Sequence, residues 1–138
     1  RPSKALKFYE YPERETCLED LTEWVGAKPT EYSGSRACCG FPILTINEKA
    51  ALKMVGNHTS TAKDLGADAM VTPCPLCHLN LDQYQSRAAG MMKRQIDLPI
   101  IHVPQLVGLA LGLDPIELKI NKHIISTKKL LSELALRP

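Results

Sequence analysis

The sequence predicts an α/β fold, built as a small parallel, Rossmann-like sheet with helices on both faces. Two short apolar runs, 68–72 and 98–103, have the length and composition of buried strands. Each run is followed by a proline and then by a segment with helical periodicity. Strands that alternate with helices favour a parallel sheet. The length of 138 residues fits one domain with a real core.

The first predicted helix covers residues 16–25. Thr16 and Glu19 have the spacing of a capping box at its start, and Gly26 can close its end. A short strand should follow over 30–33, before a turn that leads to the first cysteine pair.

The second predicted helix runs over 47–65, with Asn47 as its N-cap and Gly66 after its last turn. Its apolar positions recur at helical spacing, so one face should pack inward. That inner face comprises Ala50 or Ala51, Met54, Val55, His58, Ala62 and Leu65.

The third predicted helix, over 75–92, begins on the second cysteine pair. After the strand over 98–103 we expect an apolar helix over 105–111 and an amphipathic helix over 126–136. No repeat or linker divides the chain, so these elements should form a single unit.

Charge and composition exclude several function classes. The net charge is +2, Lys and Arg are scattered, and aromatic residues make up 5%, which argues against nucleic acid and anionic membrane surfaces. The longest apolar run, 106–113, is too short to span a bilayer. An odd count of five cysteines without a recognisable signal peptide is typical of reduced thiols. We therefore expect a cytoplasmic protein without direct membrane insertion.

Two tight cysteine pairs are the candidate metal ligands. Cys38 and Cys39 precede Gly40, and Cys74 is separated from Cys77 by two residues. Clustered thiolates are soft ligands that prefer zinc or iron–sulfur centres. Both pairs are expected at the carboxyl ends of strands, where parallel α/β sheets bind ligands. Gly40 would let the backbone bend closely around a bulky inorganic group.

Other interpretations of the cysteines stay open. They could be buried structural cysteines or a redox dithiol, and four thiolates would also satisfy a tetrahedral zinc ion. Against zinc alone, structural zinc sites usually use two knuckles of similar shape rather than contiguous cysteines. Cys17, inside the first capping box, is interpreted as an ordinary helical thiol.

The histidines are weaker candidates. His78 directly follows the second pair and could be a ligand or proton donor, although a hydrogen-bonding neighbour of the ligands is the favoured role. We expect His102 to be packed and satisfied, His58 to lie in the core or at its rim, and His123 to occupy a surface turn.

The motifs Cys38-Cys39-Gly40 and Pro73-Cys74-Pro75-Leu76-Cys77 resemble the cysteine-rich "CCG" domain. This domain is typical of the B subunit of heterodisulfide reductase, the iron–sulfur subunit of glycolate oxidase, a lactate-utilisation protein and a subunit of some succinate dehydrogenases. Residues 1–4 resemble the stretch after the first cysteine of such a domain, and 105–113 and 121–123 resemble its C-terminal end. The resemblance implies that 1–138 is one CCG domain, a C-terminal fragment of a larger subunit with two such domains.

The resemblance also implies a cofactor, a [4Fe–4S] cluster of noncubane type. Its ligands would include Cys38, Cys39, Cys74 and Cys77, with Gly40 and His78 beside them. The family pattern has a fifth, isolated cysteine, which would fall upstream of Arg1 because Cys17 is too close to Cys38. Without that thiolate, a cubane cluster, a zinc ion or oxidised thiols could take the place of the noncubane cluster.

The function implied by the resemblance is reduction of the disulfide between coenzyme M and coenzyme B, a reaction of methanogenesis. The partners would be a small thiol or disulfide substrate and other subunits of an electron-transfer complex, so the chain alone should be inactive. Two alternatives remain. One is a zinc-binding structural or interaction module, and the other is an electron-relay subunit of a quinone-linked succinate, glycolate or lactate dehydrogenase.

Overall fold

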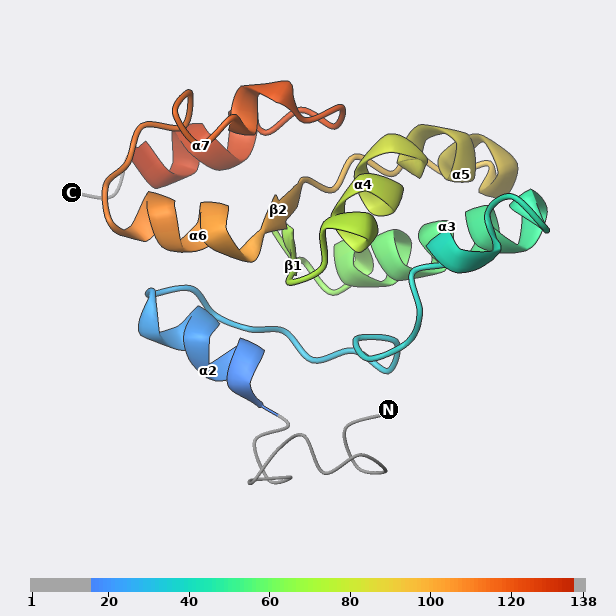
Figure 1. Cartoon of the computed structure of the whole chain (residues 1–138), viewed down its shortest axis with the longest axis horizontal. Helices are drawn as coiled ribbons and strands as arrows, with labels where there is room; N and C mark the ends of the chain where they lie inside the picture. The colour runs from blue at the N-terminus through green and yellow to red at the C-terminus, as the bar shows by residue number, and fades with distance from the viewer. Residues whose placement is uncertain (1–15, 136–138) are drawn as a thin grey trace.

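The computed structural model describes residues 16–135, so the resemblance at 1–4 lies outside the described residues. Figure 1 shows the order of the elements along the chain. They are α2 (Cys17–Trp24), the 3₁₀ helix η1 (Phe41–Ile43), α3 (Glu48–Asp64), β1 (Met70–Thr72), α4 (Pro75–Gln83), α5 (Gln85–Met92), β2 (Ile100–His102), α6 (Val103–Ala110), the 3₁₀ helix η2 (Ile120–Lys122) and α7 (Lys128–Ala135).

Strands β1 and β2 pair in parallel, which confirms the α/β class. Met70 lies opposite Ile100 and Thr72 opposite His102, so the carboxyl ends of both strands are level. Within residues 16–135 the sheet has these two strands, and a larger Rossmann-like sheet is not present. The ends of β1 and β2 lead directly into α4 and α6 (Figure 1).

The strand predicted over 30–33 is wrong. This segment is irregular and leads into turns, in which the carbonyl of Tyr32 bonds locally instead of to a neighbouring strand. The N–H of Ser35 donates to the carbonyl of Tyr32 at 3.1 Å, and that of Ala37 to Gly34 at 2.9 Å. The first cysteine pair therefore follows a loop and not a strand.

Helices α2 and α3 form where the sequence predicts them. Thr16 is the N-cap of α2, but its side chain makes no capping bond, so the expected capping box is absent. Asn47 does cap α3, since its Oδ1 accepts from the N–H of Ala50 at 3.0 Å. Leu65, placed on the inner face by the sequence, is 51% exposed because α3 has already ended at Asp64.

The single helix predicted over 75–92 is divided at Tyr84, where ψ is 0°. The buried side chain of Gln85 makes two hydrogen bonds to the backbone of Leu98. Its Oε1 accepts from the N–H at 2.7 Å, and its Nε2 donates to the carbonyl at 2.9 Å. This ties the start of α5 to the segment before β2 and turns α5 onto α3. A side chain at Gly56 would collide with Met92, so this glycine permits the close approach of the two helices.

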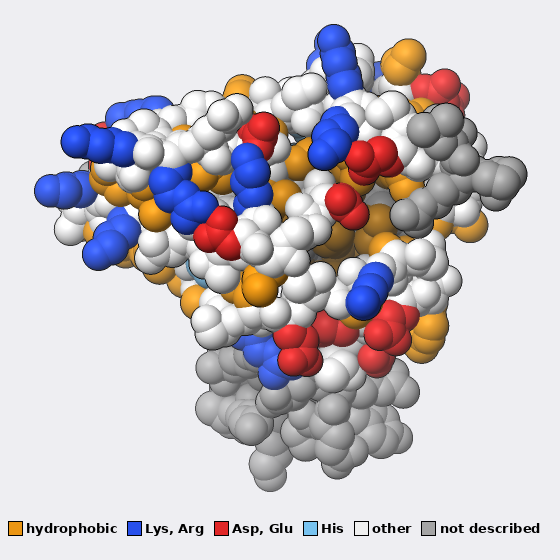
Figure 2. Space-filling model, turned by 180° about the vertical axis from the view of Figure 1, so that it is seen from behind, with side chains coloured by type: hydrophobic (Ala, Val, Ile, Leu, Met, Phe, Trp, Pro, Cys, Tyr) orange, Lys and Arg blue, Asp and Glu red, His pale blue; other side chains and the backbone are white. Residues whose placement is uncertain are grey.

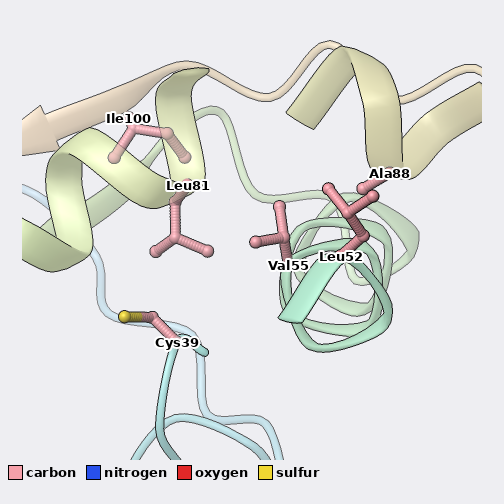
Figure 3. Close-up of a cluster of buried hydrophobic side chains, with 6 residues drawn as sticks. All are labelled: Cys39, Leu52, Val55, Leu81, Ala88 and Ile100. Carbon is pink, nitrogen blue, oxygen red and sulfur yellow. The ribbon is translucent and has the colours of Figure 1, made fainter. Parts of the chain in front are cut away.

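The core lies where α3, α4 and β2 meet (Figure 3). Val55 and Ile100 are fully buried, and Leu81 nearly so. Cys39 belongs to the same cluster, so one of the candidate ligands is held by the core itself.

The C-terminal segment is attached to α4 by one carboxylate. Buried Asp82 accepts from the N–H groups of Ile124 and Ile125, at 2.7 and 3.0 Å. Figure 2 shows acidic and basic side chains together on one face of the molecule, in agreement with the small net charge. In the described part of the chain, every helix is too short or too polar to cross a bilayer.

Candidate metal centre

The second cysteine pair is positioned by local structure. Cys74 follows β1 by one proline and is the N-cap of α4, with an extended backbone (φ −105°, ψ 125°). Pro75 occupies the first turn, where its missing N–H leaves no bond unmade. Cys77 then lies one helical turn further on, so the two thiols share the beginning of the same helix.

The first pair is held against α3 by close backbone packing. Gly40 has φ +94°, a conformation that side chains disfavour. A Cβ at Gly40 would lie 3.1 Å from both Cα and the carbonyl oxygen of Ala51. The sequence analysis attributed the glycine at position 40 to space for an inorganic group. The structure shows that the close approach of α3 already requires a glycine there.

Three of the four candidate thiols lie together. Burial, followed by the neighbouring thiols of Cys39 and Cys74, raises the pKa of Cys77 far above the ordinary thiol value. Cys39 is 6% exposed and packs in the core beside Cys77. The two pairs are linked through buried Asn80, whose Nδ2 donates to the carbonyl of Cys39 at 2.8 Å.

The pKa of the Cys74 thiol is shifted in the opposite direction to that of Cys77. The backbone N–H groups of Cys77 and Leu76 lower the pKa of the Cys74 thiol, although burial acts in the other direction. The Cys74 side chain makes no capping hydrogen bond of ordinary geometry, so these groups act as nearby dipoles at the helix start. Cys74 is therefore the thiol of this pair that ionises more readily.

Cys38 differs from the other three in its surroundings. It is exposed, and its sulfur accepts from the N–H of Gly40 at 3.4 Å. It also lines a cavity of about 370 Å³, together with Tyr32, Met54 and His58. Among residues 16–135, no three His, Cys, Asp or Glu side chains already have the arrangement of a metal site.

The donor set nevertheless fits a thiophilic metal. Three thiols are side by side, and the fourth belongs to the residue next to Cys39 and is exposed, so its side chain can reorient. Sulfur donors of this number suit zinc or an iron–sulfur cluster. Cys38, Cys39, Cys74 and Cys77 are the residues that would hold either group.

His58 and Tyr32 are site residues that the cysteine motifs did not reveal. Nε2 of buried His58 is 2.9 Å from the carbonyl of Cys38, so it must donate, and Nδ1 lies 3.0 Å from the Tyr32 hydroxyl, from which a neutral ring accepts. Burial raises the pKa of Tyr32, which keeps that hydroxyl protonated. The periodicity of α3 correctly predicts an inward His58, but no signal in the sequence identifies Tyr32 as its partner.

Three histidines form a second group at the carboxyl end of β2. The ring centroid of His78 lies 4.7 Å from that of His123 and 5.9 Å from that of His102. One nitrogen of each ring is buried without a hydrogen-bond partner: Nδ1 of His78, Nε2 of His102 and Nδ1 of His123. The prediction of His123 as a surface turn residue is wrong, and His102 is packed but not fully satisfied.

The rings of His78 and His123 are disposed to stay neutral. Burial is the main factor that lowers the pKa of His78, and His123 and His102 add to it, while Asp82 acts in the opposite direction. Burial also lowers the pKa of His123, against opposing contributions from Asp82 and the carbonyl of Ile100. The sequence indicated His78 by its position after Cys77, but contained no sign that His102 and His123 would join it.

The chain is similar to several proteins of known identity. It is 38% identical over 130 residues to the 8-methylmenaquinol:fumarate reductase membrane anchor subunit of Wolinella succinogenes, covering 94% of this chain and 45% of that protein. It is 30% identical over 136 residues to the B subunit of a CoB-CoM heterodisulfide reductase of Methanosarcina acetivorans, covering 97% and 45%. A corresponding subunit of Methanosarcina mazei is 29% identical over 119 residues, covering 85% and 40%.

The chain thus spans less than half the length of these relatives. The family model of the cysteine-rich CCG domain matches residues 4–82, which include both cysteine pairs. The histidines at 102 and 123 lie beyond the matched segment. Because the match covers more than half of the sequence, the chain belongs to the CCG family of cysteine-rich domains.

Proposed function

We propose that this chain is part of a reductase subunit in which Cys38, Cys39, Cys74 and Cys77 bind an iron–sulfur cluster. The observation that carries the proposal is the grouping of the Cys39, Cys74 and Cys77 thiols, because two distant motifs of the sequence supply them. Membership of the CCG family and the similarity to reductase subunits support a redox role. The cluster proposed is the noncubane [4Fe–4S] type, with zinc as the competing occupant.

The protein's contribution is ligation and exclusion of water. Cys39 and Cys77 are held in or against the apolar core, where a low dielectric tunes the potential of a redox group. Cys74 lies nearer to solvent, and its thiolate is favoured by the start of α4. When bound, the cluster would supply electrons singly. His78 follows Cys77 on the same helix turn and is proposed as a hydrogen-bonding neighbour of the ligands.

The reaction proposed is reduction of a mixed disulfide, such as that between coenzyme M and coenzyme B, to two thiols. The sulfur–sulfur bond takes up two electrons and two protons, and each sulfur leaves as a thiol. Two of the relatives are named as B subunits of heterodisulfide reductases. Since the chain spans less than half of them, we propose that turnover needs the remainder of the subunit and the other subunits of a cytoplasmic complex.

A second candidate is an electron-relay subunit of a quinone-linked dehydrogenase or reductase. The specific observation in its favour is the 38% identity to the fumarate reductase membrane anchor subunit. In this role the same cysteine centre would pass electrons between a flavin or iron–sulfur partner and a quinone, without any disulfide substrate.

Metal and sulfide analysis tests the cluster. The chain is purified anaerobically, and iron, acid-labile sulfide and zinc are measured for the native sequence and for single Cys→Ser variants at positions 38, 39, 74 and 77. We expect iron and sulfide in equal amounts, lost in each variant and retained in the control Cys17→Ser. Stoichiometric zinc without iron in every preparation would reject iron–sulfur binding by these four cysteines in this chain and favour a structural zinc site.

Substrate assays on the native multisubunit complex separate the two redox roles. With a reduced viologen as electron donor, a disulfide reductase should oxidise the dye when a mixed disulfide is added and release two thiols for every two electrons. A quinone-linked relay should instead oxidise the dye with a menaquinone analogue and leave the disulfide intact.

A further inference from the structure

Gln105, in the first turn of α6, has an orientation that the backbone determines. Its Oε1 accepts from the N–H of His102 at 3.0 Å, and its Nε2 donates to the carbonyl of Leu118 at 2.9 Å. A backbone N–H can only donate and a carbonyl can only accept. The two ends of the Gln105 amide are therefore assigned without reference to any histidine.

This assignment places the proton of His123. Nε2 of Gln105 also lies 3.0 Å from Nε2 of His123, and since the amide nitrogen can only donate, the imidazole nitrogen must accept. A neutral imidazole that accepts at Nε2 carries its hydrogen on Nδ1. That Nδ1 is buried and makes no hydrogen bond of strict geometry, although the carbonyl of Ile100 acts on the same ring.

The same glutamine also acts on His102. In the capping box of α6, the side chain of His102 faces the backbone N–H of Gln105, although without strict hydrogen-bond geometry. Because Nε2 of His102 is buried without a partner, the nitrogen that faces this N–H is Nδ1. His102 then carries its hydrogen on Nε2. Gln105 thus leaves two buried N–H donors on two neighbouring rings.

The rings of His123 and His102 each form a T-shaped contact with that of His78, at centroid distances of 4.7 and 5.9 Å. Nδ1 of His78 is buried and unpartnered as well, and with a lone pair it can accept from one of the two rings, of which His123 is the nearer. We propose that Gln105 sets the proton positions of a relay of three histidines, so that His78 accepts at Nδ1 and carries its hydrogen on Nε2. The contact requires a rotation of the rings, because in the structure these nitrogens have no hydrogen-bond partner.

The chemistry of this group argues against a metal site. His123 has no lone pair to offer, since Nε2 is occupied by Gln105 and Nδ1 is protonated. The relay instead presents a neutral N–H from the residue next to Cys77, on the first turn of α4. On the proposed function, this N–H is a donor for a sulfur that carries negative charge at the cysteine centre. Gln105 is then a positioning residue that acts through the rings.

Histidine tautomers can be measured directly. Long-range ¹H–¹⁵N NMR spectra of the reduced, metal-free chain are recorded at about pH 8, above the ordinary imidazole pKa of about 6.5. We expect hydrogen on Nδ1 of His123 and on Nε2 of both His102 and His78. Hydrogen on Nε2 of His123, or on Nδ1 of His78, would overturn the proposal in the native chain, without need of any variant.

Gln105→Glu is the matched perturbation, because it keeps the shape and replaces the donor by an acceptor. We expect the His123 hydrogen to move to Nε2 and His78 to lose its Nε2–H preference, while the exposed Gln83→Glu leaves all three rings unchanged. If His123 changes and His78 does not, then the carbonyl of Ile100 is the acceptor for His123 and the relay is wrong. These tautomers are read without iron, so failure to bind a cluster would reject the proposed function and not the relay.

Discussion

The Cys74–Cys77 pair is positioned by its immediate neighbours in the chain, whereas the Cys38–Cys39 pair is positioned by residues remote in sequence. A strand end, a proline and a helix start suffice to set the spacing of the second pair. The first pair sits in an irregular loop that depends on α3 and α4 through Ala51, His58 and Asn80. Tertiary contacts therefore decide whether the two pairs meet, and substitutions at those contacts should separate them while leaving the second pair intact.

The largest effect is expected for Gly40→Ala. Its φ of +94° disfavours a side chain, and the added carbon would press on the backbone of α3, which cannot yield as a flexible side chain would. We expect a loss of about 3 kcal/mol in the free energy of unfolding, measured by urea titration.

Gly26→Ala is the matched control for this substitution. Its φ is +83°, but no atom lies within 4 Å of an added Cβ, so only the backbone conformation is penalised. We expect a loss of about 1 kcal/mol. Equal losses at the two positions would show that the approach of the first pair to α3 contributes nothing to stability.

Asn80→Ala tests the link between α4 and the first pair. The substitution removes the donor from the carbonyl of Cys39 and leaves that buried oxygen unpaired. We expect about 2 kcal/mol of destabilisation by urea titration and a fall in iron content after anaerobic purification. The exposed Asn121→Ala in η2 should change neither quantity. Unaltered iron binding in Asn80→Ala would mean that the loop is held in place by other contacts.

Tyr32→Phe tests the outer end of the chain of bonds that reaches Cys38. It keeps the aromatic ring against His58 and deletes one hydrogen bond, so we expect a loss of about 1 kcal/mol. Without the Tyr32 hydroxyl, the His58 ring is held less firmly, and its hydrogen bond to the Cys38 carbonyl weakens. The rate of alkylation of Cys38, followed by mass spectrometry, should rise relative to that of the exposed Cys17. A constant ratio of the two rates would restrict His58 and Tyr32 to a packing role.

The same contrast explains what the sequence could predict. Local rules predicted α3 and β1 correctly. The helix begins at the capping residue Asn47 and ends before Gly66, which has a positive φ, and the apolar run before Cys74 forms the strand. The strand predicted over 30–33 did not form, because a strand needs a neighbour to pair with and the carbonyl of Tyr32 bonds within a turn instead. The group around His78 could not be foreseen, since His102 and His123 join it only after β2, α6 and the C-terminal segment have packed.

The smallest effect is expected far from both pairs, at the ion pair between Asp64 at the end of α3 and Arg94 after α5. The Arg94 guanidinium holds the pKa of Asp64 below its ordinary value. A carboxylate with a lowered pKa in the folded state adds stability above its ordinary pKa, and this contribution disappears as the pH falls through the folded-state pKa. Asp64→Asn should therefore differ slightly from the native chain at neutral pH and not at all in strong acid, as urea titrations at several pH values would measure.

Salt provides the control for this ion pair. Because both side chains are exposed, the difference between Asp64→Asn and the native chain should also shrink in high salt. A difference that persists in acid would mean that Asp64 acts through the end of α3 rather than through its charge.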